Sequence, residues 1–337
     1  RRSHDANRHR NRSARADPRE AGPCQTGSAH PMAPRFAGND KWKESQVKFR
    51  ISAAVSSAPA SSPSHNLQEV SVQLTERDFT LVRQLISEYA GIKLSAQKRN
   101  MVYNRLLRRL RAHGVDSFAA YLELVQADSA CERQAFVNAL TTNLTAFFRE
   151  PHHFELLATR AAVRARRGVA PMRVWSSACS TGEEAWSIAM VLREAGCAAD
   201  IHATDIDSEV LRTASAGVYR DERVSDLQPE RLKKHFLRGT GSNEGWVSIR
   251  PELRTMTRFS QLNLQSPVWA GQDRFDAIFC RNVVIYFDRE DQKRLADRFA
   301  DMLLPGGVLM VGHAESFPAG HPAFRSCGRT AYERVTT

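Results

Sequence analysis

A strand, a tight turn and a helix are predicted around residues 172–192, and the turn carries groups suited to a cofactor. The strand holds Val174 and Trp175, the turn lies at Cys179–Gly182, and an apolar helix follows. Backbone N–H groups at such a turn and at the start of the helix favour a polar or anionic ligand. A dinucleotide-binding turn needs three glycines, whereas this turn has only Gly182. NAD is therefore not indicated.

A carboxylate ends the second predicted strand, which runs from Ile201 to Asp205. An Asp at this position, beside the first turn, suits the paired hydroxyls of a ribose. An ordinary βαβ unit whose Asp caps a helix shows the same pattern. The spacing alone leaves nucleoside binding and a structural role equally open.

A polar segment with a charged end precedes this α/β unit. It contains Thr142, Asn143 and Thr145, then an aromatic pair, Arg149 and Glu150. Ligand sites occur preferentially where two domains meet. On pattern alone, such a segment is more often a polar linker than a ligand site.

Helices are predicted throughout residues 67–140, which would form a small all-α domain. Thr75 begins the first helix with a capping-box-like pattern. A second helix runs from Ser95 to about His113 and stops at a glycine. Two shorter helices follow it.

The second helix has an apolar face and an arginine-rich face. At about 100° per residue, Leu106 and Leu110 fall on one arc. A run of charged residues on a helix most often simply faces solvent. Here the arginines have no acidic partner at i,i+4, so an acidic protein surface or phosphates would suit them. The basic residues on the opposite arc are Lys98, Arg105, Arg108, Arg109 and Arg111.

The rest of the chain alternates strands and helices, with one interruption. The interruption is an insertion over about 227–260, in which a turn at Gly239–Gly245 precedes the alternating Trp246–Ile249. A further strand is expected at Met256–Phe259. We predict a small antiparallel sheet here, of the kind that often carries partner recognition.

After the insertion, the α/β pattern resumes. We expect a strand at Phe275–Cys280, a helix capped by Asp288, a strand at Val308–Val311 and a last strand near Tyr332–Val335.

The net charge of +11 is concentrated near the N-terminus, where residues 1–65 hold 12 Lys and Arg against 5 Asp and Glu. The remainder is nearly balanced, which weakens a nucleic-acid interpretation. Residues 1–66 lack periodicity and are predicted to be a disordered basic tail. Two interpretations stay open: the segment lies upstream of the true start, for instance before Met32, or it touches acidic partners.

The six cysteines are scattered without a CxxC pair, which predicts reduced thiols and no metal site. No apolar run approaches the roughly 18 residues of a membrane span. The arginine-rich start has no apolar core of a secretory signal. The sequence therefore predicts a cytoplasmic protein.

Six stretches follow one another in an order that matches a known family: TTNLTAFFRE, ACSTGEE, ATDID, LRGTGSNEG, LNL and FCRNVVIYFD. From about Leu67 to its C-terminus, the chain resembles the chemotaxis receptor glutamate methyltransferases of the CheR type. Several independent motifs in one order are far more specific than any single motif.

The resemblance implies an α/β protein with a class I AdoMet-dependent methyltransferase fold. In that fold, residues 141–337 form a mainly parallel seven-stranded sheet with helices on both faces and an antiparallel β-subdomain insertion. The implied reaction transfers a methyl group from S-adenosyl-L-methionine (AdoMet) to glutamate side chains of chemoreceptors during chemotaxis adaptation. Its products are glutamyl 5-O-methyl esters and S-adenosyl-L-homocysteine.

The resemblance also implies roles for particular residues. Arg149 and Tyr286 would lie near the transferred methyl. The arginine-rich face (Arg105, Arg108, Arg109 and Arg111) would meet the cytoplasmic domain of methyl-accepting chemoreceptors. The turn at Gly239–Gly245 would dock a receptor's C-terminal pentapeptide. The implied cofactor contacts are Asn143, Thr145, Arg149, Glu184, Asp205, Asn263, Leu264, Arg281 and Asn282.

Two features depart from the family pattern. Ala185-Trp186 replaces the usual Pro-Tyr, a change expected at the edge of the cofactor site, and the basic tail has no counterpart in the family.

Two other functions compete with the glutamate methyltransferase interpretation. A non-catalytic module that binds AdoMet or its product would bind without methyl transfer, and an RNA methyltransferase would bind RNA with steep salt dependence.

Overall fold

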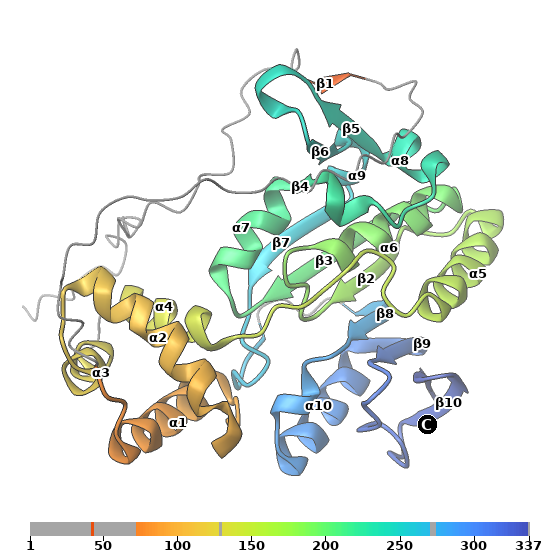
Figure 1. The fold of residues 1–337 in the computed structure, drawn as a ribbon. Coiled ribbons are helices and arrows are strands. Elements are labelled where there is room, and N and C mark those ends of the chain that lie inside the picture. Colours follow the sequence, from red (N-terminus) through yellow and green to blue (C-terminus); the bar gives the residue numbers. More distant parts are fainter. Residues whose placement is uncertain (1–41, 44–71, 128–129, 270–273, 336–337) are drawn as a thin grey trace, which may run out of the picture. The chain divides into compact units, whose positions relative to one another are not determined.

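The structure is a computed structural model, and it describes residues 42–43, 72–127, 130–269 and 274–335. These residues form a helical domain and a mixed α/β domain (Figure 1). The predicted disorder of residues 1–66 falls almost wholly outside the described ranges. Within that segment, Trp42–Lys43 form a short strand, β1, which the sequence did not predict.

The helical domain confirms the predicted all-α arrangement. Its helices are α1 (Glu76–Ala90), α2 (Arg99–His113, after the 3-10 turn Ala96–Lys98), α3 (Phe118–Gln126) and α4 (Ala130–Leu140). The side chain of Thr75 accepts a hydrogen bond from the Asp78 N–H at 3.1 Å, and the Asp78 carboxylate accepts the Thr75 N–H at 3.0 Å. This is the predicted capping box.

The main sheet has seven strands in the order β10-β11-β9-β8-β2-β3-β7. Strands β9, β8, β2, β3 and β7 are parallel, whereas β11 and β10 are antiparallel. This confirms the predicted class I methyltransferase fold. The strands are β2 (Met172–Ser176), β3 (Ala199–Asp205), β7 (Thr257–Gln261), β8 (Phe275–Cys280), β9 (Leu303–Val311), β10 (Phe324–Gly328) and β11 (Ala331–Arg334).

Helices cover both faces of this sheet (Figure 1). Successive residues of a strand point to opposite faces of the sheet. In β2, Val174 packs in one core cluster with residues of α5 and α6, whereas Trp175 packs in another with residues of α10. The helices are α5 (His152–Arg167), which the sequence did not predict, α6 (Glu183–Glu194), α7 (Ser208–Ala216) and α10 (Arg289–Met302).

A second, antiparallel sheet forms the β-subdomain, with strand order β1-β5-β6-β4. The strand expected at 256–259 does not belong to it. That strand is β7, which pairs parallel to β3 in the main sheet, because a short alternating run does not reveal its partner. The elements of this region are β4 (Val218–Arg220), the 3-10 turn Asp221–Val224, α8 (Pro229–His235), β5 (Phe236–Gly239), the 3-10 turn Gly241–Asn243, β6 (Trp246–Ile249) and α9 (Pro251–Arg254).

One cysteine departs from the predicted reduced state. Cys131 is disulfide-bonded, whereas Cys179, Cys197, Cys280 and Cys327 are free. In the described ranges, no helix has both the length and the apolar character needed to cross a membrane.

Candidate active site

One cavity lies where the helical domain meets the carboxyl ends of β2, β3 and β8. It encloses about 1210 Å³ of empty space, part of it open to solvent. Lys98, at the end of the 3-10 turn before α2, and Met101, in the first turn of α2, contribute to its wall. All residues predicted to touch the cofactor or the transferred methyl line this cavity: Asn143, Thr145, Arg149, Glu184, Asp205, Asn263, Leu264, Arg281, Asn282 and Tyr286.

Asp205 is held at the end of β3 by backbone N–H groups. Its carboxylate accepts hydrogen bonds from Ser180 N–H at 2.8 Å and from Asp207 N–H at 3.0 Å. Only 7% of the residue is exposed, and this burial raises the pKa of Asp205 to about 6. The carboxylate is therefore mostly ionised at neutral pH and able to accept further hydrogen bonds from hydroxyl groups.

Asp207 is a positioning residue that the sequence reasoning missed. One oxygen of its carboxylate accepts the Glu209 N–H at 2.8 Å and caps α7. The other accepts hydrogen bonds from the Thr141 hydroxyl and the Asn143 amide, both at 2.8 Å. Because the Ser180 hydroxyl also donates to the Asn143 carbonyl at 3.0 Å, the polar segment after α4 is fixed against the first turn.

The turn at Cys179–Gly182 requires its glycine. Gly182 has φ of +97°, and a Cβ there would lie 2.8 Å from the Cβ of Ala214. The turn therefore packs closely against α7, and α6 begins directly after it.

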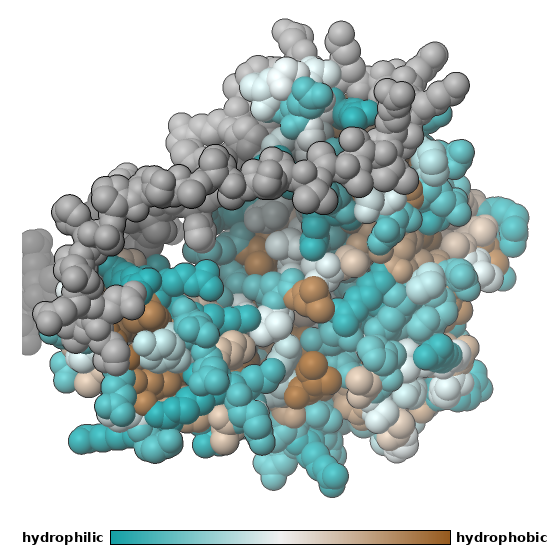
Figure 2. Space-filling model, viewed as in Figure 1, coloured by the Kyte–Doolittle hydropathy of each residue, from teal (hydrophilic) through white to brown (hydrophobic). Residues whose placement is uncertain are grey.

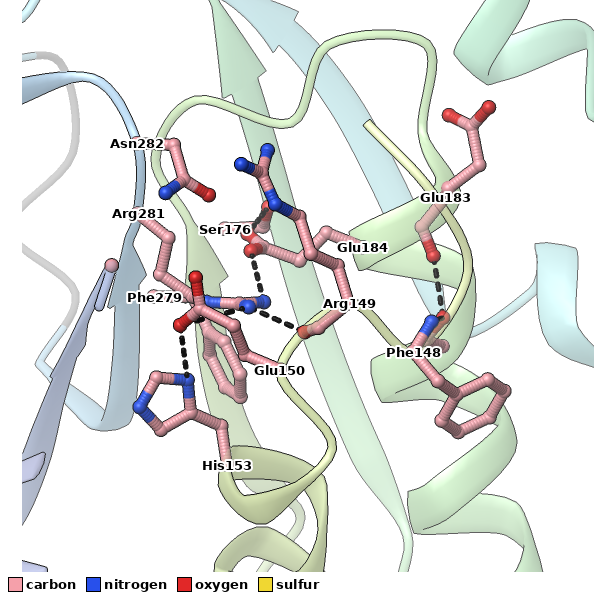
Figure 3. A network of polar contacts seen from close by, with 12 residues as sticks. Phe148, Arg149, Glu150, His153, Ser176, Glu183, Glu184, Phe279, Arg281 and Asn282 are labelled. Carbon is pink, nitrogen blue, oxygen red and sulfur yellow. Dashed lines mark hydrogen bonds and ion pairs between the residues drawn. The ribbon is translucent and has the colours of Figure 1, made fainter. Parts of the chain in front are cut away.

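A buried arginine lies between two carboxylates at the end of β8 (Figure 3). Arg281 contacts Glu184 at 3.0 Å and Glu150 at 3.4 Å, and it donates to the Arg149 carbonyl. Burial raises the pKa of Glu184 despite the nearby guanidinium. Burial also opposes ionisation of Glu150, but the charge of Arg281 and a hydrogen bond from His313 outweigh it and hold the pKa of Glu150 at about 2.

The backbone is strained around this arginine. Among the described residues other than glycine, Phe148, Glu150, Ser180 and Asn282 have φ between +50° and +58°. Each such conformation costs about 1–3 kcal/mol and persists only where the surroundings fix it. These residues flank the cavity or lie in its wall, so the fold holds the loops here in one defined arrangement.

Tyr286 is positioned by an anchor that the sequence reasoning also missed. The buried Glu315 carboxylate accepts the N–H groups of Asn282 and Val284 at 2.8 Å, and that of Gly312 at 2.7 Å. The Tyr286 carbonyl accepts the Lys93 N–H at 3.0 Å from the helical domain. No described residue is hydrogen-bonded to the Tyr286 hydroxyl, which leaves it available in the cavity.

The Asn263 amide joins the two domains. It donates to the Tyr89 carbonyl at 2.9 Å, while its oxygen accepts the Gln265 N–H at 2.9 Å. The neighbouring Leu264 is 5% exposed and lines the cavity. Asn263 thus positions this loop, and Leu264 supplies apolar surface.

The arginine-rich face of α2 is only partly exposed, because two of its four arginines make hydrogen bonds within the chain. That the four arginines meet a substrate stays a prediction. Arg105 donates to the carbonyls of Ala139 and Thr141, and Arg109 donates to the Glu132 carboxylate at 3.1 Å. These partners lie beyond α2 in the sequence, so an i,i+4 inspection does not find them. Arg108 and Arg111 are exposed, and none of the four lines the cavity.

Glu150, His152 and His153 have the donor atoms of a metal site, within 4.8 Å of one another. Their geometry is explained without a metal. Arg281 and His313 contact the Glu150 carboxylate at 3.4 and 3.1 Å, and Thr330 is 2.9 Å from His153. A metal ion there would face the fixed charge of the guanidinium.

Ala185 and Trp186, which depart from the family pattern, do not line the cavity. Trp186 is 1% exposed, donates to the Ala214 carbonyl at 3.1 Å and packs against Phe259. The expected effect of this change on the edge of the cofactor site is therefore not supported.

Two family models match the chain: the all-alpha domain of CheR methyltransferases at residues 77–141, and their SAM binding domain at residues 143–332. Both matches begin after β1. The chain is 49% identical to the chemotaxis protein methyltransferase of Klebsiella aerogenes, over 77% of this chain and 90% of that protein. The Salmonella typhimurium protein of the same name is 47% identical, over 82% of this chain and 97% of that protein.

Proposed function

We propose, because the chain belongs to the CheR methyltransferase family, that it methylates glutamate side chains of chemoreceptors and forms glutamyl 5-O-methyl esters. The family supplies the coarser statement directly: the chain is an AdoMet-dependent methyltransferase of chemotaxis. One observation supports a carboxylate as acceptor. Arg149 lines the cofactor cavity, and in the described part of the chain its guanidinium donates to the Leu144 carbonyl at 3.0 Å and meets no acidic side chain.

The residues of the cavity fit AdoMet. Asp205 offers an ionised acceptor for ribose hydroxyls, Leu264 offers apolar surface for a base, and Glu184 adds a carboxylate. The buried Nε of Arg281 has no hydrogen-bond partner among the described residues, so this group is available to a ligand. When bound, AdoMet supplies a methyl group already activated by its sulfonium.

The protein's task is then mainly orientation. A glutamate with a pKa near ~4.3 is ionised at neutral pH, so no general base is required. Correct placement of two reactants supplies about 7–11 kcal/mol in the best cases. We assign Arg149 the placement of the carboxylate by a charge-assisted hydrogen bond, and Tyr286 a hydrogen bond to it or the pocket wall. Arg149 has to position the glutamate carboxylate without neutralising its charge, because a carboxylate oxygen that is bound too tightly attacks the methyl group slowly.

Charge and a peptide dock are proposed to recognise the receptor. Exposed large hydrophobic residues are few and separate among the described ones, and Figure 2 shows small hydrophobic patches on a largely hydrophilic face. Arg108 and Arg111 would meet acidic receptor helices, and the Gly239–Gly245 turn would dock the receptor's C-terminal pentapeptide. Because these receptor regions are cytoplasmic, the proposal places the enzyme in the cytoplasm, and no nucleic acid is involved.

The test is transfer of labelled methyl from AdoMet to a receptor cytoplasmic fragment, with a version whose glutamates are replaced by alanine as control. Label that mild base releases as methanol, and that the control lacks, establishes a glutamyl ester. Binding of AdoMet without labelling of any receptor fragment would instead favour the non-catalytic module. Base-stable label would overturn the proposed ester.

A further inference from the structure

The β-subdomain carries a strand from outside its own sequence region. In this sheet, β5 pairs with β6 on one side and with β1 on the other. The β1 pairing is antiparallel and places Trp42 opposite Gly239 and Lys43 opposite Arg238. Figure 1 shows β1 beside β5, far along the sequence from it. Without β1, β5 would be an edge strand.

An edge strand offers unpaired N–H and C=O groups that an extended peptide can pair with. The end of β5 has a second feature that points to a ligand. Asn243 is 2% exposed, and its side-chain N–H₂ group has no hydrogen-bond partner among the described residues. Asn243 lies directly beside Gly239, because a Cβ on that glycine would come within 1.9 Å of the Asn243 carbonyl.

The connection between β1 and the rest of the chain does not force this pairing. Residues 44–71 join β1 to the helical domain, and a segment of that length spans on the order of 90 Å when extended. The length of the connection alone does not place β1 here, so the pairing itself depends on the β5 edge.

We propose that the outer edge of β5 is a strand-docking site that this chain fills with its own segment, β1. Because the proposed receptor pentapeptide would use the same part of the β-subdomain, it has to displace β1 first. This second clause rests on the proposed function, whereas the docking of β1 does not. The N-terminal segment then acts as a tethered competitor for the receptor peptide.

In the described part of the chain, two residue pairs hold β1 against β5, so the closed state is expected to outweigh the open state by a modest factor. The apparent Kd of a competing peptide rises by the inverse of the open fraction. A closed population of 70–90%, on the order expected for so short a pairing, corresponds to a roughly three- to tenfold weaker apparent affinity.

The test compares three full-length chains: wild type, Lys43→Pro and Lys48→Pro. Proline lacks the backbone N–H and fixes φ, so the first substitution disrupts β1. The second places the same change in the same segment but outside β1. The probe is a fluorescein-labelled synthetic peptide with the sequence of residues 39–45, and its binding is followed by fluorescence anisotropy.

Lys43→Pro should bind the probe about three- to tenfold more tightly than wild type, and Lys48→Pro should match wild type. Backbone amides of β5 should exchange hydrogen several-fold faster in Lys43→Pro alone when no probe is present. Equal probe affinity in all three chains, or equal β5 exchange, overturns the proposal. Unchanged AdoMet binding in each variant confirms an intact fold, and because neither readout uses methyl transfer, failure of the proposed function would be seen separately.

Discussion

Arg149 is the residue whose replacement best separates orientation from cofactor binding. Its guanidinium lines the cavity and is held by the Leu144 carbonyl. A hydrogen bond to a charged group is worth about 1.5–3 kcal/mol, so Arg149→Ala should lower kcat about 10- to 150-fold, and more than it lowers cofactor affinity. Tyr286→Phe removes one hydroxyl and should cost less. Turnover numbers and calorimetric Kd values check this, and wild-type turnover in both variants would remove the two proposed roles.

Asp205 predicts a pH dependence of cofactor binding. Burial raises its pKa to about 6, above the usual value near ~3.9, so the free enzyme takes up a proton as the pH falls through 6. A ribose needs the ionised form as acceptor. The Kd of S-adenosylhomocysteine should therefore be flat above pH 7 and rise below pH 6, by at most about tenfold per pH unit for one proton.

Two substitutions at the ends of the same strand test the assignment. Asp205→Asn should bind the cofactor weakly at every pH, without the inflection near 6. Asp200→Asn, at the half-buried start of β3, where Asp200 pairs with Arg258 at 2.8 Å, should keep the wild-type profile. An inflection that survives in Asp205→Asn would assign the titration to another group.

At the scale of elements, Glu315 fixes the turn that carries Asn282 and Tyr286. Its carboxylate accepts three backbone N–H groups, and each buried donor left unsatisfied costs about 1–3 kcal/mol. Glu315→Gln replaces one acceptor oxygen by a donor, so Tm should fall by several degrees and kcat should fall with it. Glu290→Gln, on an exposed position of α10, is the matched control. A wild-type Tm with normal kcat in Glu315→Gln would contradict the anchoring role.

Local patterns predicted most elements because they depend on neighbours in sequence. The capping side chains of Thr75 and Asp288 start their helices as expected. Long-range pairing was not predictable in this way. The residues of β10 after Phe324 are exposed, so the strand has no alternating pattern to reveal it. The partners of Glu315 and the sheet that receives β7 depend on contacts between distant segments.

The site residues show the same division. The motifs placed ten side chains in one cavity, but they did not reveal that Asp207 holds Asn143 or that Glu150 neutralises Arg281. Such supporting contacts join loops that only the folded chain brings together. Family motifs therefore identify the wall of the cavity better than the residues that keep it in place.

At the scale of the molecule, the two domains share the cavity and are joined through it. Lys93 N–H donates to the Tyr286 carbonyl at 3.0 Å, and the Asn263 amide donates to the Tyr89 carbonyl at 2.9 Å. The helical domain thus supplies part of the wall as well as the basic face of α2. Changes on that face should therefore divide into effects on folding and effects on receptor recognition.

Arg108 and Arg109 are adjacent, and the structure assigns them to different sides of that division. Arg109 pairs with Glu132, whose side chain is 6% exposed and also accepts the Tyr121 hydroxyl at 2.7 Å. Removing one partner of a buried pair costs about 3–5 kcal/mol, so Arg109→Ala should lower Tm markedly. Arg108 is exposed, and Arg108→Ala should leave stability within about 0.5 kcal/mol. Arg108→Ala should instead raise the KM for the receptor fragment several-fold. This increase in KM should become smaller at higher salt, because salt screens the contact between the charges. Thermal unfolding and KM values at two ionic strengths test this division. If Arg109→Ala raised KM without lowering Tm, and Arg108→Ala changed neither quantity, receptor recognition would have to be assigned to Arg109 instead of Arg108.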